Sequence, residues 1–200
     1  QNGKFHAILA TSSIKEAIEY YRLIKAQSDL NITTLFDPNI DNNGAAHDKA
    51  AGLLEIVEDY NQKFGQDFTF VTHAKFKKDI AARLGHKKPY AHIAKNPEQQ
   101  INLLIVVDQM LTGFDSKWLN TLYLDKVIKY ENIIQAFSRT NRLFNEIEKP
   151  FGTIRYYRKP HTMEQHINRA VKLYSGDKPI ALFVQRLESN LNKLNAIFKE

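Results

Sequence analysis

One run of five apolar residues, Leu103–Val107, constrains the fold of this chain more than any other stretch. The run is too short for a helix and is rich in β-branched residues, so it predicts a strand buried on both faces of a parallel sheet. Parallel sheets bind ligands beyond the carboxyl ends of their strands. The residues that follow the run suit such a place: Asp108, Gln109, Thr112, Gly113 and Asp115. The sequence therefore predicts a binding site after this strand.

A second predicted strand, residues 121–124, ends at Asp125 and leads into a predicted helix over residues 130–142. A step of about 100° per residue divides that helix into two faces. The apolar face, expected to pack on the sheet, consists of Tyr130, Ile133, Ile134 and Phe137. The polar face consists of Gln135, Ser138, Arg139 and Arg142. Arginines on a helix most often form an ordinary solvated face. The position of these arginines after a glycine-acid turn instead favours phosphate binding. Each guanidinium can donate hydrogen bonds to two phosphate oxygens at once.

These residues resemble known motifs. The pattern Gln135-x-x-Ser138-Arg139-x-x-Arg142 is similar to the sixth motif of superfamily two helicases and translocases, and DQMLTGFD at residues 108–115 is similar to their fifth motif. The stretch VDQMLTGFDSKWLNTLYLDK, followed by IIQAFSRTNR, resembles more closely the second RecA-like motor domain of the restriction (R) subunit of type I restriction-modification enzymes. The likeness is strongest over residues 101–158. Two positions depart from the superfamily: Val107 replaces a threonine that contacts nucleic acid, and Ser138 replaces a glycine.

The alternation of strands and helices predicts a three-layer α/β domain with a mostly parallel sheet. The resemblance implies that residues 1–160 form a RecA-like motor domain and that residues 161–200 begin a helical region leading into a further helical domain. It also implies roles at an ATP site. Gly113 and Asp115 would approach the ribose or the γ-phosphate side, Gln135 would sense the phosphates, and Arg139 and Arg142 would act as arginine fingers.

The resemblance further implies a fragment of an ATP-dependent DNA translocase and endonuclease. The sequence has no G-x-x-x-x-G-K-[ST] loop, so ATP and its magnesium would be held mainly by a first motor domain outside this chain. We therefore expect the isolated chain neither to hydrolyse ATP nor to cut DNA. Expected partners are double-stranded DNA, the first motor domain and the nuclease domain of the same polypeptide, and modification and specificity subunits. Alternatives are another superfamily two helicase and a nucleic-acid-binding module without nucleotide chemistry.

Two regions are candidates for contact with nucleic acid. A predicted strand at residues 5–10 leads to Thr11, Ser12 and Ser13, at the start of a helix whose Glu16 completes a capping box. These hydroxyls and the free N–H groups of the helix start could also hold a DNA phosphate. A helix is predicted from Thr72, the second candidate cap, to about Gly85. Residues 73–95 around it carry seven Lys or Arg and one acid, Asp79, in a chain of net charge +6.

Among the basic residues of this segment, the candidates for contact with the DNA backbone are Lys77, Lys78, Lys87 and Lys88. A solvated helix face is the alternative interpretation of the same lysines. The remaining predicted strands cover residues 31–36, 68–71 and 152–157, and the remaining helices cover residues 46–64, 163–174 and 180–198.

Other classes of site are disfavoured by the residues present. The chain has no cysteine, and its seven histidines lie at spacings that do not suit a metal, so we expect no metal site. The stretch DPNIDNNGAAHD alternates like a calcium loop but lacks glycine at its sixth position and glutamate at its twelfth, so a turn is expected there. No apolar run is long enough to cross a membrane, and a cytoplasmic location is expected.

Overall fold

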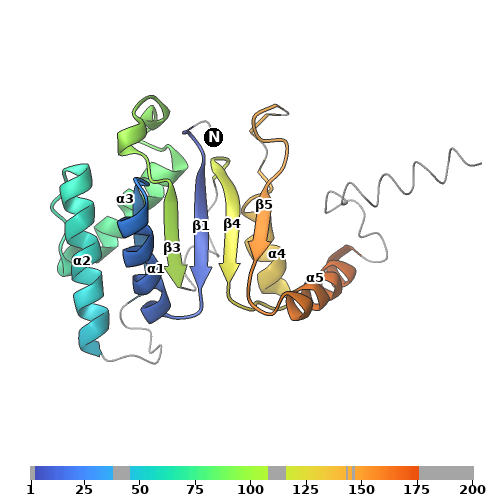
Figure 1. Cartoon of the computed structure of the whole chain (residues 1–200). Helices are drawn as coiled ribbons and strands as arrows, with labels where there is room; N and C mark the ends of the chain where they lie inside the picture. Colours follow the sequence, from blue (N-terminus) through green and yellow to red (C-terminus); the bar gives the residue numbers. More distant parts are fainter. Residues whose placement is uncertain (1–2, 38–45, 108–115, 143, 146, 176–200) are drawn as a thin grey trace, which may run out of the picture.

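The computed structural model describes residues 3–37, 46–107, 116–142, 144–145 and 147–175. Its centre is a parallel sheet of five strands in the order β2–β3–β1–β4–β5 (Figure 1). The strands are β1 (His6–Thr11), β2 (Ile32–Leu35), β3 (Leu103–Val107), β4 (Leu119–Asp125) and β5 (Thr153–Tyr156). The predicted α/β class and parallel sheet are confirmed.

The central strand is β1, which pairs with β3 on one side and with β4 on the other. All five residues of β3 are buried, as the unbroken apolar run predicted. The predicted strand at residues 121–124 is also confirmed, although β4 begins two residues earlier. Predicted strand 152–157 corresponds to β5, an edge strand of the sheet.

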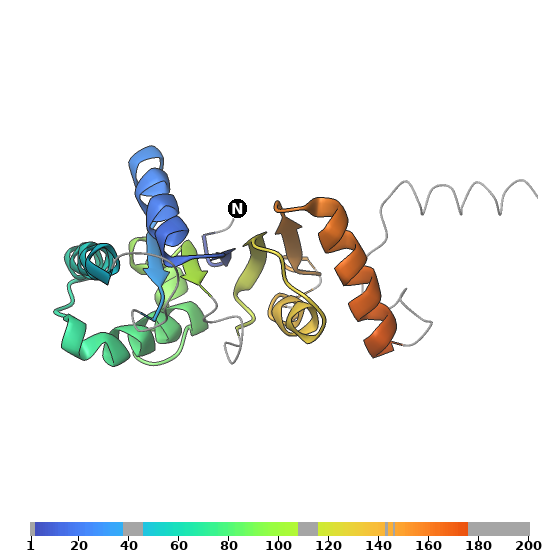
Figure 2. The ribbon, with the colours of Figure 1, turned by 90° about the horizontal axis from the view of Figure 1, so that it is seen from below.

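In the described part of the chain, five helices surround the sheet: α1 (Ile14–Gln27), α2 (Ala46–Phe64), α3 (His73–Gly85), α4 (Glu131–Ser138) and α5 (Pro160–Ser175). Viewed along the strands, α1 covers one face of the sheet and α3 and α4 cover the other (Figure 2). Helix α2 lies beside β2 and α1, and α5 lies beyond β5 against α4. Short 3₁₀ turns occupy Phe70–Thr72, Ile93–Lys95 and Pro97–Gln99.

The start of α1 is capped as the sequence predicted. The Ser13 hydroxyl accepts a hydrogen bond from the backbone N–H of Glu16 at 3.2 Å. The Glu16 carboxylate accepts one from the N–H of Ser12 at 3.0 Å. The first bond satisfies a backbone donor that a helix start leaves open, whereas the second holds the N–H of the residue before the cap and not that of Ser13, as a capping box would. Helix α1 therefore begins at a fixed point, directly after β1.

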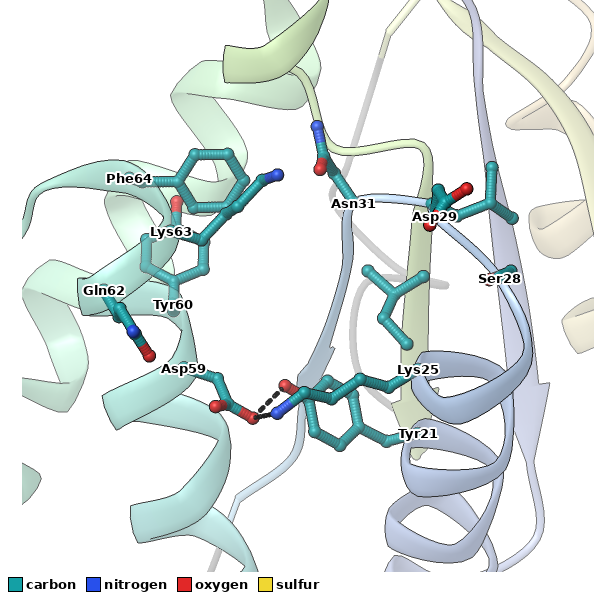
Figure 3. A pocket seen from close by; sticks show the side chains of 12 residues that line it. Tyr21, Lys25, Ser28, Asp29, Asn31, Asp59, Tyr60, Gln62, Lys63 and Phe64 are labelled. Atoms are coloured by element: carbon teal, nitrogen blue, oxygen red, sulfur yellow. Dashed lines mark hydrogen bonds and ion pairs between the residues drawn. The ribbon is translucent and has the colours of Figure 1, made fainter.

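Near their carboxyl ends, α1 and α2 border a hollow of about 540 Å³ (Figure 3). At one side of this hollow the Lys25 ammonium and the Tyr21 hydroxyl both donate to the Asp59 carboxylate. Burial, with the hydrogen bond to Asp59, raises the pKa of Tyr21. The hydroxyl therefore stays protonated as a donor, and we assign this hollow to packing between the two helices.

The predicted strand at residues 68–71 is wrong. Phe68 is held by the side chain of Asn61, whose amide donates to the Phe68 carbonyl at 2.7 Å and accepts from the Phe68 N–H at 2.9 Å. The chain then enters a 3₁₀ turn in which Phe70 and Val71 are 58% and 92% exposed. An apolar run predicts a strand only where neighbouring backbone supplies the hydrogen bonds, and here one side chain supplies them.

The predicted helix at residues 130–142 is shorter in the structure. Helix α4 ends at Ser138, so Arg142 lies beyond its end. Ile133 and Phe137 are buried as predicted, but Tyr130 is 44% exposed and stands before the helix with a positive φ of 46°. Tyr130 therefore does not pack on the sheet. Its ring lies 5.5 Å from the Arg169 guanidinium of α5 instead.

One residue of the basic segment, Arg83, is buried within the fold. Its Nε donates to Asp79 at 2.9 Å, and its Nη1 donates to the carbonyl and side-chain oxygens of Gln99, both at 3.0 Å. The guanidinium lies 4.3 Å from the centroid of the Phe64 ring and 4.1 Å from that of the Tyr90 ring. Arg83 is 2% exposed, so it contributes packing and no accessible charge to the basic segment.

Helix α5 packs on the sheet domain through Met163 and Ala170, both fully buried. The N–H of Ile128 lies 3.4 Å from the Met163 sulfur, and the Ile128 carbonyl lies 3.0 Å from Nδ1 of His166. The further helical region predicted from residue 161 onward stays a prediction, because the described residues end at 175. Across the described ranges, no helix is both long and apolar enough to cross a membrane.

Candidate functional site

A network of polar side chains links β1, α1, β4 and β5 at the carboxyl edge of the sheet. Its centre is Asp125, the last residue of β4. The Arg158 guanidinium donates to both Asp125 oxygens, at 3.0 and 3.2 Å, and the Tyr20 hydroxyl donates at 2.8 Å. The Ser12 hydroxyl donates to the Asp125 carbonyl at 3.2 Å. Arg158 also donates to Glu16 at 2.6 Å and thereby fixes the carboxylate that caps α1.

The protonation of this network follows from its contacts. Burial alone would raise the pKa of Asp125, but hydrogen bonds from Arg158 and Tyr20 outweigh it and lower that pKa. The hydrogen bonds to Asp125 and Glu16 raise the pKa of Arg158. Both groups therefore stay charged at neutral pH. Sequence patterns gave no signal for this network, because Arg158 lies far along the chain from both of its carboxylate partners.

Next to this network is an open hollow of about 610 Å³, lined by Ser12, Lys126, Val127, Arg158 and Lys159. Three of these five residues are cationic, and the hollow lies beyond the carboxyl ends of β1, β4 and β5. Ser12 and Lys159 are exposed, whereas Lys126 and Arg158 are half-buried. This arrangement suits an anionic group such as a phosphate of a nucleic acid backbone.

The hydroxyl groups that were predicted to contact DNA differ in their exposure and in the hydrogen bonds that they form within the fold. Thr11 is fully buried, and its hydroxyl lies 3.3 Å from the carbonyl of Val106, to which it donates. Its side chain therefore does not reach the surface, which contradicts its predicted role in holding DNA. Ser12 is exposed, whereas the hydroxyl of Ser13 is the cap of α1. Thr72 stands at the predicted cap position of α3, but its hydroxyl instead accepts from the N–H of Thr69 at 2.7 Å.

The four predicted lysines are all exposed. Lys77 and Lys78 lie on α3, and Lys87 and Lys88 follow its end. The end of α3 lies near the start of β4, because the His86 ring stacks on the Trp118 ring with centroids 4.0 Å apart. The exposed lysines therefore follow α3 along the face of the sheet that this helix covers. They end near the edge formed by the amino-terminal ends of the strands, called the amino edge below. Its role with DNA stays a prediction.

The arginine segment, defined here as residues 139–142, lies at this amino edge. Arg139 follows the last residue of α4 and is half-buried, and Arg142 is exposed. The buried Lys149 ammonium donates to the carbonyls of Arg142 and Lys117. Lys117 directly precedes Trp118, whose carbonyl accepts from the N–H of His6 at the start of β1 at 3.1 Å. Arg142 is thereby placed beside the amino-terminal ends of the strands.

A second contact fixes the same segment. Thr140 is 1% exposed, and its hydroxyl donates to the carbonyl of Phe137 at 3.0 Å. Gly152 packs so closely on Thr140 that a Cβ at position 152 would collide with the Thr140 side chain and carbonyl. The glycine is therefore required by close approach of the two segments. Neither Lys149 nor Gly152 was recognised from the sequence as part of a site.

The predicted site residues that the structure describes are therefore divided between two edges of the sheet: Ser12 lies at the carboxyl edge, and Arg139 and Arg142 lie at the amino edge. Gln135 and Ser138 are exposed on α4, which leads from the carboxyl edge to the arginine segment. Gly113 and Asp115 lie outside the described residues. Within the described ranges, no group of three His, Asp or Glu side chains has a geometry that could hold a metal ion.

Two histidines near the arginine segment, the buried His6 and the half-buried His86, have lowered pKa values. Burial, together with the charges of His86 and Lys149, lowers the pKa of His6 to about 3. Burial and the charge of Lys117 lower the pKa of His86 to about 4. Both rings are therefore neutral in the folded protein at pH 6, whereas an unfolded histidine titrates near about 6.5.

We expect the melting temperature of the chain to fall as the pH drops from 7 to 5. Below about pH 6.5 the unfolded state binds protons that the folded state excludes, so stability present above that pH is lost on acidification. His6→Asn removes one of these groups and should flatten the profile measured by thermal melts. His161→Asn on the surface of α5 is the control. An unchanged profile in His6→Asn would contradict a neutral buried His6.

Comparison with known proteins identifies the family. The model for domain 3 of the type I restriction enzyme subunit R matches residues 3–159, which include every strand of the sheet and the arginine segment. The chain belongs to the type I restriction enzyme subunit R domain 3-like family. The endonuclease subunit of type I restriction enzyme SauCOLORF180P from Staphylococcus aureus (strain COL) is 35% identical over 189 residues, covering 88% of this chain and 18% of that protein.

Two other relatives agree with this assignment to the subunit R family. The SsaAORF53P endonuclease subunit from Staphylococcus saprophyticus is 37% identical over 185 residues, covering 88% of this chain and 19% of that protein. The putative MjaIXP endonuclease subunit from Methanocaldococcus jannaschii is 27% identical over 199 residues, covering 96% of this chain and 16% of that protein. The chain thus spans less than a fifth of the length of these relatives.

Proposed function

We propose that this chain is the second RecA-like motor domain of a type I restriction enzyme R subunit and supplies the arginine half of an ATPase site. Family membership over residues 3–159 and the parallel sheet support this proposal. In the proposed enzyme, ATP lies between this domain and a first motor domain of the same polypeptide, which holds most of the nucleotide and its magnesium. Hydrolysis of ATP drives movement along double-stranded DNA. The nuclease domain and the modification and specificity subunits complete the assembly.

The observation that carries the proposal is the state of the arginine segment. Arg142 is exposed, while the backbone around it is fixed by a buried ammonium group and by the contact between Thr140 and Gly152. An arginine on an ordinary solvated surface does not need its backbone held by a buried ammonium group such as that of Lys149. A fixed backbone with an accessible guanidinium is what stabilisation of phosphoryl charge requires, because the donor must be in place before the charge develops.

The residues of this chain act on the nucleotide in distinct ways under this proposal. Arg139 and Arg142 meet the phosphoryl oxygens, where a permanent charge and a forked donor are favourable. Gln135, exposed on α4, contacts the phosphate network from the same side. Gly113 and Asp115 approach the nucleotide by resemblance to the fifth motif. The isolated chain should not hydrolyse ATP, since the half of the site that holds the phosphates is on another domain.

The test is DNA-stimulated ATP hydrolysis by the complete R subunit carrying Arg139→Ala or Arg142→Ala. Loss of turnover with DNA binding retained in the absence of nucleotide is the expected result. If turnover stays within a few-fold of the unmodified subunit, the arginines are surface residues and the proposal is wrong. In that case the basic segment would favour a binding module without nucleotide chemistry.

The carboxyl edge is the proposed place of the DNA backbone on this domain. Ser12 and Lys159 are exposed there beside Arg158, and the hollow between them is open and cationic. Lys77, Lys78, Lys87 and Lys88 are proposed to extend the contact along the basic segment. All of these groups recognise phosphate without reading bases, which suits a motor that moves over any sequence.

Joint replacement of Lys77, Lys78, Lys87 and Lys88 by glutamine should weaken DNA binding and reduce its salt dependence. Each lost phosphate contact lowers the log–log slope of affinity against salt by about 0.9 for duplex DNA. Binding is measured by fluorescence anisotropy at several salt concentrations on duplexes of different sequence. The control makes the same change in net charge at exposed residues outside the basic segment: Lys63, Lys129, Arg155 and Lys172. Equal slopes in both variants would assign the lysines to a solvated face.

A further inference from the structure

Lys149 is a buried ammonium group that is bonded to backbone carbonyls. It is 1% exposed, and its Nζ donates to the carbonyl of Lys117 at 3.1 Å and to the carbonyl of Arg142. Among the described residues, no carboxylate lies within ion-pair distance of it. Burial lowers the pKa of Lys149 to about 8. A buried charge without a counter-ion is costly, so a lysine at this place indicates a role that an apolar side chain would not fill.

The backbone of Lys149 is anchored independently of the arginine segment. Its N–H donates to the carbonyl of Asn145 at 3.2 Å, and the Asn145 side chain accepts from the N–H groups of Ile147 and Glu148 at 3.0 and 2.6 Å. Glu148 forms an ion pair with Lys4, near the beginning of the chain. Lys149 therefore extends from a fixed turn, and the carbonyls that it binds are held relative to that turn.

One of the two carbonyls belongs to a residue with a proposed nucleotide contact, and the other follows the fifth motif in the sequence. Arg142 is itself a proposed arginine finger, and Lys117 lies two residues after Asp115 in the sequence. One ammonium group thus joins the end of the sixth motif to a residue that follows the fifth motif in the sequence. The Thr140 and Gly152 contact limits movement of the arginine segment from the other side.

We propose that Lys149 is a positioning residue, whose ammonium group holds the backbone of Arg142 against that of Lys117 so that the Arg142 guanidinium meets the phosphoryl group of ATP. The inference rests on the proposed function. Lys149 itself does not touch the nucleotide. Its effect on the reaction passes through Arg142, and displacement of a catalytic group by about 1 Å costs roughly 10²-fold in rate.

The experiment uses the complete R subunit with Lys149→Met, which keeps an unbranched chain and removes the charged donor. We expect kcat for DNA-stimulated ATP hydrolysis to fall about 10- to 100-fold. The KM for ATP and the nucleotide-free affinity for DNA should change little. Lys149→Arg should recover most of the activity, because a guanidinium can donate to both carbonyls. Lys63→Met, at an exposed position on α2, is the matched control and should have no effect.

A double-mutant cycle with Arg142→Ala separates positioning from a general loss of folded protein. If Lys149 acts through Arg142, Lys149→Met causes no further loss of kcat in the Arg142→Ala background. Damage to the fold would lower kcat by the same factor in both backgrounds. If Lys149→Met is unfolded at the assay temperature, Lys149→Gln, which keeps an amide donor, replaces it in the same cycle.

The outcomes distinguish this inference from the proposed function. An Arg142→Ala subunit with normal turnover overturns the proposed function and the inference with it. A large effect of Arg142→Ala, combined with an unaltered kcat in the lysine variant or with multiplicative effects in the cycle, overturns the inference alone. Failure of Lys149→Arg to recover activity in a folded subunit would also contradict it.

Discussion

Arg142→Ala in the complete R subunit is expected to reduce ATP turnover by about 10³- to 10⁵-fold, the range that arginine fingers contribute. That factor corresponds to roughly 4–7 kcal/mol of transition-state stabilisation. Arg142 is exposed and lies beyond the end of α4, and replacement of an exposed side chain usually changes stability little. We expect the free energy of unfolding to change by less than about 0.5 kcal/mol. Arg139→Ala should show the same loss of turnover.

Steady-state ATPase and melting temperature, measured side by side, check this expectation. Arg142→Lys should recover little activity, because an ammonium group has no fork with which to contact two oxygens. Arg155→Ala, at an exposed position on β5, is the control for loss of a surface arginine. A large fall in melting temperature for Arg142→Ala would show that its side chain serves the fold. The loss of turnover would then not count as catalytic.

Arg83→Ala should lower the stability of the chain by about 3–5 kcal/mol. Asp79 would keep its hydrogen bonds from the hydroxyls of Tyr60 and Tyr90 but lose the adjacent cation. The rings of Phe64 and Tyr90 would lose the guanidinium that lies between them. Removal of one partner from a buried pair leaves the other charge uncompensated, which explains the size of the effect.

Urea denaturation of the purified chain measures this loss. Lys75→Ala, at an exposed position in the same helix, is the matched control and should stay within about 0.5 kcal/mol of the unmodified chain. Arg83→Lys should recover only part of the loss, because lysine keeps the charge without the planar group that stacks on two rings. A cost below about 1 kcal/mol for Arg83→Ala would mean that the site relaxes and that the pair is not essential.

Features that depend on local sequence were predictable. Apolar periodicity located β3, α2 and the start of α1, and the cap formed by Ser13 and Glu16 follows from side chains three residues apart. The arginine pattern was recognised by its spacing. Its position in the fold was not, because α4 ends four residues before Arg142 and the segment then turns at Thr140.

Features that depend on distant contacts could not be read from the sequence. Residues 68–71 have the composition of a strand, and only the hydrogen bonds of Asn61 remove Phe68 from a sheet. Arg158 looks like one basic residue among many until the fold brings it to Asp125. Lys149 likewise has no local pattern, since its partners are carbonyls, which every residue carries.

The pairing order of the sheet also determines when the protein can fold during its synthesis. Strand β1 pairs only with β3 and β4 among the described strands, and β2 pairs only with β3. Ala7 and its partner Leu103 are roughly 100 residues apart, so at about 5–20 residues per second β1 waits roughly 5–20 s after leaving the ribosome before any neighbour appears. Emergence of β3 is then the event that allows the nascent chain to collapse into a sheet, and until that moment an apolar strand is exposed to chaperones and to aggregation.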